Sequence, residues 1–183
     1  AATRSITLGT RTFTNHNKLL WRYEGCVGLK TGYTEHAGRT LVSAARRDGV
    51  TLICVTLNAP SDWADHTALF DWGFSSYEAR TLVQAGERVG QLPVSGGLIP
   101  VCSVQTAEGR TAALASGEPV EAAYELTEQV LAAPVSAGTQ VGEAVYSVNG
   151  TELARVPLVA GEQVPDASAP ERGVRLWRNV FKN

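Results

Sequence analysis

The chain has 183 residues, which is more than one typical domain and less than two. Its apolar fraction of 44% is ordinary for a globular protein, and its formal charge of −2 gives no reason to expect a nucleic-acid partner. Three scattered cysteines exclude a disulfide framework or a zinc site, and neither a signal peptide nor an apolar run of membrane-spanning length is present. Because the sequence opens on Ala1 and not on methionine, we expect a processed or truncated product.

The first part of the chain predicts a hairpin and a small sheet. Residues 7–14 are typical of a short hairpin, and a first sheet strand is expected over about 26–33. Two further strands, over 39–46 and 50–57, are joined by Asp48-Gly49, a strong hairpin signal. Small and apolar residues occur at both the odd and the even positions of these strands, which point to opposite faces. This pattern predicts a sheet that is covered on both faces.

A helix is predicted directly after the third strand. Ser61 is the expected N-cap, and Asp62 and Asp65 in the first turn suit the helix dipole. Large apolar side chains recur at helical spacing and are expected to pack on the sheet: Trp63, Leu69, Phe70, Phe74 and Tyr77. His66 lies in the same helix, where we expect a structural residue that is partly buried or on the surface.

From about Ala79 the composition changes to glycine, proline, valine and threonine, which predicts a small all-β domain. Strands are expected over 81–83, 101–104, 120–126, 141–148 and 153–159. Asn149-Gly150 predicts a hairpin turn. Two similar segments, 85–90 and 137–142, each predict a turn that leads into a strand.

The end of the chain predicts a basic amphipathic segment. Val174, Trp177 and Phe181 share one helical face, and the cations Arg172, Arg175, Arg178 and Lys182 lie largely elsewhere. This pattern is compatible either with attachment to a membrane surface or with a solvated end.

Lys30 is the first candidate site residue. It is one of three lysines in the chain, and it stands in an otherwise uncharged run from Gly25 to Thr34. Gly28 and Gly32 flank it, and glycine within a strand often marks the close approach of a ligand or of another backbone. A cation, a hydroxyl and bare backbone on one strand suit an anionic, peptide-like ligand. The alternative for the tripeptide alone is a solvated lysine on an edge strand.

Lys30-Thr31-Gly32 is also one of three motifs of the serine β-lactamases and penicillin-binding proteins. With its flanking segments the chain resembles the D-alanyl-D-alanine carboxypeptidases among the low-molecular-mass penicillin-binding proteins. Segments 15–21, 27–34, 37–42 and 71–74 carry this resemblance, in that order. It implies an α+β chain with three parts: the C-terminal part of a serine β-lactamase/transpeptidase-like catalytic domain over 1–78, a small all-β, sandwich-like domain over 79–165, and a tail over 166–183.

The resemblance also implies roles for four residues. The complete enzyme would attack the bond between two D-alanines with a serine and hydrolyse the acyl-enzyme, with no metal or cofactor. Lys30 would bind the terminal carboxylate and help to relay protons, and Thr31 would hydrogen-bond the same carboxylate. Gly32 would let the substrate backbone lie against the strand, and the N–H of Tyr33 would be one oxyanion donor.

The family's nucleophile is missing from this sequence. A Ser-x-x-Lys motif would need serine three residues before a lysine, where the chain has Asn15, Val27 and Asn179. Ser147-Val148-Asn149 has the letters of the family's Ser-x-Asn motif, but it falls on a predicted hairpin of the all-β region and is interpreted as a coincidence. We therefore expect this chain to be inactive alone and to need a co-folded N-terminal fragment that carries Ser-x-x-Lys and Ser-x-Asn.

The expected partners are a peptidoglycan stem peptide that ends in D-Ala-D-Ala, β-lactams that mimic it, and a membrane surface. The expected location is the cell envelope, peripheral to the outer face of the cytoplasmic membrane. One alternative is a non-catalytic cell-wall binding or scaffold module. A class A-like β-lactamase shares Lys-Thr-Gly, but it has no all-β second domain.

Overall fold

The structure is a computed structural model that describes residues 1–168. The predicted amphipathic face at 172–182 lies outside the described residues. The chain divides into two compact units, and each is described by itself below. The first unit holds residues 1–80 and 112–118, and the second holds residues 81–111 and the chain from 119 onward.

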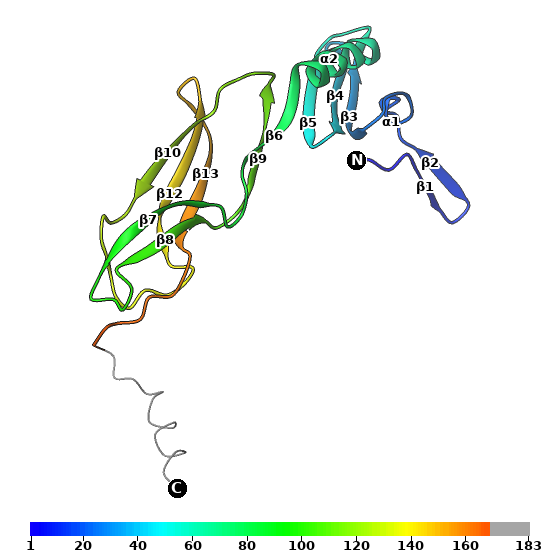
Figure 1. Cartoon of the computed structure of the whole chain (residues 1–183). Coiled ribbons are helices and arrows are strands. Elements are labelled where there is room, and N and C mark those ends of the chain that lie inside the picture. Colours follow the sequence, from blue (N-terminus) through cyan, green and yellow to red (C-terminus); the bar gives the residue numbers. More distant parts are fainter. Residues whose placement is uncertain (169–183) are drawn as a thin grey trace. The chain divides into compact units, whose positions relative to one another are not determined.

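A three-stranded antiparallel sheet in the order β3-β4-β5 is the centre of the first unit (Figure 1). Strand β3 spans Cys26–Thr34, β4 spans Gly38–Arg47 and β5 spans Val50–Thr56. Asp48 and Gly49 join β4 to β5 with φ of 47° and 83°, the positive values that a two-residue hairpin turn requires. Among the described strands, β3 pairs only with β4, so β3 is an edge strand.

Helix α2, Asp62–Ser76, packs on one face of this sheet (Figure 1). Phe70 is fully buried there, and Trp63 and Phe74 are partly buried beside it, as the helical spacing predicted. Leu69 differs from the prediction, because it is 47% exposed on the side of α2 away from the sheet core. The core below α2 also contains residues from α1 and the strands: Leu19, Tyr23, Leu41, Ala45 and Cys54.

No helix of the described part of the chain covers the opposite face of the sheet, and its apolar residues on β5 are exposed. The strand register places Val42 and Val55 opposite one another on this face, and Ile53 shares it. Ile53 is 68% exposed and Val55 is 57% exposed. The prediction of a sheet covered on both faces is therefore wrong for this structure, because α2 covers only one of them.

A hairpin and a short helix precede the sheet. Strands β1, Ser5–Leu8, and β2, Arg11–Thr14, form the hairpin predicted near residues 7–14. Helix α1, Leu19–Arg22, is a single turn that buries Leu19 in the core of the unit.

The second unit is built on one six-stranded sheet in the order β10-β12-β13-β8-β7-β11 (Figure 1). These strands are β7 Arg88–Ser95, β8 Val101–Thr106, β10 Glu121–Leu126, β11 Leu131–Ala132, β12 Gln140–Val148 and β13 Thr151–Ala160. Strands β6, Tyr77–Val83, and β9, Arg110–Ala115, form a separate two-stranded sheet.

The four inner strands of the six-stranded sheet share one apolar core. Leu92 from β7 and Val104 from β8 are buried in the same cluster as Tyr146 from β12 and Leu158 from β13. Asn149 and Gly150 turn β12 into β13 with φ of 49° and 76°, as predicted. The predicted α+β class with a small all-β domain is confirmed.

Candidate functional site

A cleft of about 610 Å³ lies beside β3 and the start of α2. Its lining residues are His16, Lys18, Lys30, Thr31, Gly32, Tyr33, Arg39, Thr40, Asp62 and Trp63. The four residues that the sequence analysis selected, 30–33, all line this cleft. Two of the chain's three lysines also line it, although the whole chain has a net charge of −2. The cleft is therefore locally basic and suits an anionic ligand.

Lys30 and Thr31 leave β3 on opposite faces of the sheet. Lys30 pairs with Val42, on the face that α2 leaves open, and Thr31 pairs with Leu41, on the face that α2 covers. The Lys30 ammonium donates to the carbonyl of Thr31. In the part of the chain that the structure describes, Lys30 has no carboxylate partner, so its charge is available to a ligand.

Gly32 leaves space for the side chain of the residue paired with it. It lies directly opposite Thr40 on β4, and a Cβ at this position would collide with the Thr40 hydroxyl. Beside it, Tyr33 pairs with Arg39 and is 70% exposed. The predicted roles of Gly32 in substrate approach and of the Tyr33 N–H as an oxyanion donor stay predictions.

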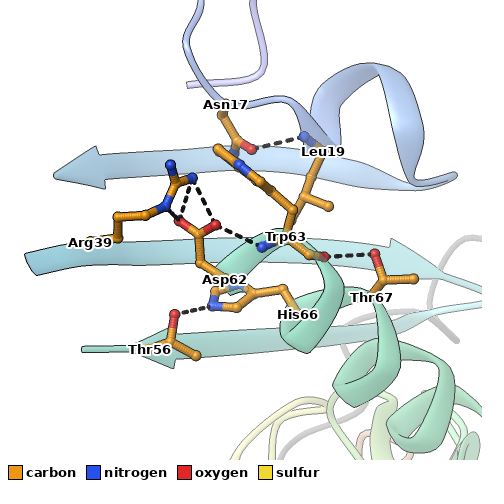
Figure 2. A network of polar contacts seen from close by, with 8 residues as sticks. All are labelled: Asn17, Leu19, Arg39, Thr56, Asp62, Trp63, His66 and Thr67. Atoms are coloured by element: carbon orange, nitrogen blue, oxygen red, sulfur yellow. Dashed lines mark hydrogen bonds and ion pairs between the residues drawn. The ribbon is translucent and has the colours of Figure 1, made fainter. Parts of the chain in front are cut away.

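Arg39 and Asp62 form a two-pronged ion pair at the start of α2 (Figure 2). Nη2 of Arg39 donates to Oδ1 of Asp62 at 2.8 Å and to Oδ2 at 3.0 Å, and Nε donates to Oδ2 at 3.2 Å. The backbone N–H of Trp63 donates to Oδ1 of Asp62 at 2.9 Å. Ser61 occupies the N-cap position as predicted, but its side chain makes no capping hydrogen bond. Asp62 takes over that role because its oxygen reaches a free N–H of the first turn.

His66 lies one helical turn after Asp62 and is fully buried, which corrects the prediction of a partly buried or surface residue. Its Nδ1 is 2.5 Å from Oγ of Ser43. Its Nε2 is 3.0 Å from Oγ1 of Thr56, the contact that Figure 2 shows. Burial lowers the pKa of His66, and the nearby carboxylates of Asp62 and Asp65 oppose this shift. The neutral imidazole thus links α2 to both β4 and β5, and it fixes the helix turn that carries Asp62.

We expect the stability of the first unit to fall as the pH drops below about 6.5, the ordinary pKa of histidine. Below this pH the unfolded chain binds more protons at His66 than the folded chain does, so acid favours unfolding, by at most about 1.4 kcal/mol per pH unit. Urea unfolding of the wild type and of His66→Gln between pH 8 and pH 5 measures this. The stability advantage of the wild type should shrink with acid. A constant difference across that range would contradict a buried neutral imidazole.

No role in the site was predicted for the other six residues that line the cleft: His16, Lys18, Arg39, Thr40, Asp62 and Trp63. The position of Arg39 near the site could have been predicted from the sequence, because a hairpin between the first two sheet strands pairs it with Tyr33. Lys18 could also have been selected as a candidate site residue, because the chain has only three lysines. The position of Asp62 depends on how α2 packs on the sheet, and no local pattern reports this.

Two family models match consecutive parts of the chain. Residues 2–61 match the model described as D-alanyl-D-alanine carboxypeptidase. Residues 77–166 match the model described as penicillin-binding protein 5, C-terminal domain.

Among curated proteins, D-alanyl-D-alanine carboxypeptidase DacC from Escherichia coli is 31% identical over 158 residues, covering 83% of this chain and 40% of that protein. D-alanyl-D-alanine carboxypeptidase DacF from Bacillus subtilis is 28% identical over 159 residues, covering 84% of this chain and 41% of that protein. The chain therefore spans about 40% of the length of these relatives.

Solved structures agree with these matches. Penicillin binding protein 5 from Haemophilus influenzae aligns with a TM-score of 0.67 and 27% identity, over 90% of this chain and 50% of that one. A peptidoglycan synthesis regulatory factor from Streptococcus pneumoniae aligns with a TM-score of 0.72 and 26% identity, over 89% and 50%. The order of the two matched models and the shared fold show that the chain belongs to the low-molecular-mass penicillin-binding proteins of the D-alanyl-D-alanine carboxypeptidase family.

Proposed function

We propose that this chain supplies the substrate-binding strand of a serine-type D-Ala-D-Ala carboxypeptidase that trims peptidoglycan stem peptides. The observation that supports this most is that Lys30, Thr31, Gly32 and Tyr33 lie on an edge strand and line one basic cleft. An edge strand has unpaired N–H and C=O groups, which an extended peptide can meet as an added strand. The lysine then lies where the negative end of such a peptide can reach it.

In this proposal three residues of the strand contact the substrate. Lys30 exchanges its contact with the Thr31 carbonyl for the substrate's terminal carboxylate, which is the stronger, charge-assisted partner. The Thr31 hydroxyl donates to the same carboxylate. The N–H of Tyr33 stabilises the negative oxygen of the tetrahedral intermediate. β-Lactams, as mimics of D-Ala-D-Ala, enter the same cleft.

The nucleophile comes from a segment with Ser-x-x-Lys and Ser-x-Asn motifs that co-folds with this chain. No lysine of the chain follows a serine at the required spacing. We therefore expect no covalent labelling when fluorescent penicillin is added to this polypeptide alone. Labelling should appear when the polypeptide is refolded with a family segment that carries both motifs. Labelling of the isolated chain would refute the proposal that the nucleophile comes from another segment.

A non-catalytic cell-wall binding module is the second candidate function, and the missing Ser-x-x-Lys motif is the observation that favours it. The same refolding experiment separates the two functions. A mixture that binds a D-Ala-D-Ala peptide but neither hydrolyses it nor takes up penicillin would support the binding module.

A peptidoglycan substrate places the protein outside the cytoplasm, in the cell envelope. No helix in the described residues is long and apolar enough to cross a membrane. We propose peripheral attachment through the basic, apolar sequence at 172–182, because each cation near an anionic bilayer contributes roughly 1 kcal/mol. Flotation with anionic vesicles should recover the full chain, less of it at high salt, and little of a chain that ends at Ala169. Equal recovery of both chains would mean that the tail is a solvated end.

A further inference from the structure

Arg39 is a second cation in the cleft, and the fold holds it more firmly than it holds Lys30. Nε and Nη2 of Arg39 both donate to Asp62, whose side chain is only 4% exposed. The guanidinium carbon also lies 5.7 Å from the centre of the Trp63 ring. Within residues 1–168 the Lys30 side chain makes one hydrogen bond, to the carbonyl of its neighbour Thr31. Arg39 has thus lost much of its rotamer freedom before any ligand arrives.

Arg39 also keeps donors that a ligand can use. A guanidinium has five N–H groups, and the bonds to Asp62 involve those of Nε and Nη2. Nη1 has no hydrogen-bond partner among the residues that the structure describes, and Figure 2 shows the other terminal nitrogen of Arg39 turned away from Asp62. The side chain is 43% exposed and lines the cleft.

The Asp62 side chain is buried, and both of its carboxylate oxygens already accept hydrogen bonds. Oδ1 accepts from the N–H of Trp63 and from Nη2 of Arg39, and Oδ2 accepts from Nε and Nη2 of Arg39. With two donors on each oxygen and a side chain only 4% exposed, the carboxylate is not free to bind a cationic ligand. Asp62 therefore sets the direction of the guanidinium, and the charges left facing the cleft are positive.

We infer that Arg39 is a second anchor for the free C-terminal carboxylate of a peptide ligand, and that Asp62 is the residue that positions it. This inference rests on the proposed function, because it concerns the same cleft and the same class of substrate. Lys30 attracts the carboxylate as a mobile point charge. Arg39, opposite Tyr33 on the next strand, adds a donor with a fixed direction. Together they select a peptide with a free carboxylate over one whose end is amidated or continues as a chain.

The test compares acetyl-D-Ala-D-Ala with its C-terminal amide, binding to the full chain in NMR titrations. The wild type should bind the acid at least about tenfold more tightly than the amide, as expected for a charge-assisted hydrogen bond. Arg39→Gln should remove most of this preference and leave the affinity for the amide unchanged. Arg39→Lys keeps the positive charge but loses the planar set of guanidinium N–H donors, so it should give an intermediate preference.

Asp62→Asn distinguishes positioning from simple charge. If only the net charge of the cleft mattered, removal of this carboxylate would strengthen binding of the acid. If Asp62 directs Arg39, the preference for the acid should fall by several fold, although the cleft becomes more positive. Stronger binding of the acid by Asp62→Asn would overturn the positioning role, and thermal unfolding of each variant confirms that it is folded.

Arg47→Gln is the matched control. Arg47 lies on the same strand, but its guanidinium carbon lies 4.7 Å from the Phe74 ring centre, and it does not line the cleft. This variant should keep the wild-type preference for the acid. An equal preference in Arg39→Gln and the wild type, or a wild type without any preference, would overturn the inference. Loss of the preference in Lys30→Ala but not in Arg39→Gln would overturn it while leaving the proposed function intact.

Discussion

Lys30→Ala, in the enzyme completed by its N-terminal segment, should lower kcat/KM for a D-Ala-D-Ala peptide by about a hundredfold or more. Loss of one preorganised electrostatic contact at a reacting centre typically costs this much. The effect should appear in both kcat and KM, because the carboxylate remains bound through acylation. Steady-state hydrolysis of an acylated D-Ala-D-Ala peptide measures it.

Lys18→Ala is the matched control for this substitution. Lys18 is also an exposed lysine that lines the cleft, but it precedes helix α1 and is not part of the binding strand. We expect less than about a tenfold change, from the general field of the cleft. Lys30→Arg should recover only part of the activity, because a planar fork needs a different geometry. Near-wild-type hydrolysis by Lys30→Ala would show that another group anchors the substrate.

The parts of the fold that the sequence predicted are those that local chemistry determines. Asp48-Gly49 and Asn149-Gly150 form tight hairpins because both residues of each pair adopt positive φ, which few other residues accept. Gly86 and Gly138 also have positive φ, at 74° and 82°, and lead into β7 and β12 as the two similar segments predicted. These features need no information from distant parts of the chain.

Strand β7 was predicted only at its start, and the rest of it was missed for a physical reason. In β7, Gly90 and Pro93 interrupt the apolar alternation, and both residues are normally signals against a strand. The structure keeps the strand because Leu92 and Val94 on either side of Pro93 fall in the core of the second unit. Tertiary burial here outweighs the local signal.

The candidate site also has one part that the sequence predicted and one part that it did not. The tripeptide from Lys30 to Gly32 was visible because its residues are adjacent. The pair of Arg39 and Asp62 was not, because 23 residues separate them and their contact depends on where α2 begins on the sheet. That position depends in turn on buried His66, which contacts Ser43, 23 residues away in the sequence, and Thr56, 10 residues away.

The open face of the first unit should bind the segment that carries the nucleophile. Ile53 and Val55 are largely exposed there, and Leu57, just after β5, is 75% exposed. Such a contiguous apolar surface marks a contact site in a soluble protein. Since the relatives are more than twice as long as this chain, the family supplies a segment of the right kind to cover it.

Ile53→Asp tests this assignment by its different effects on the chain and on the complex. In the chain alone the substitution should change the free energy of unfolding by less than about 1 kcal/mol, because the side chain is already 68% exposed. In the complex it removes a buried apolar contact and places a charge in its position. Binding of the N-terminal segment, measured by calorimetry, should therefore weaken by roughly 3 kcal/mol, about a hundredfold.

Leu69→Asp makes the same chemical change on the outer side of α2, where the side chain is 47% exposed. It should leave binding of the segment unchanged, because α2 covers the other face of the sheet. Equal weakening by both substitutions would mean that the segment is repelled by added negative charge in general. No weakening by Ile53→Asp would mean that the open face is not the contact surface, and the missing nucleophile would then have to approach the cleft from the free edge of β3.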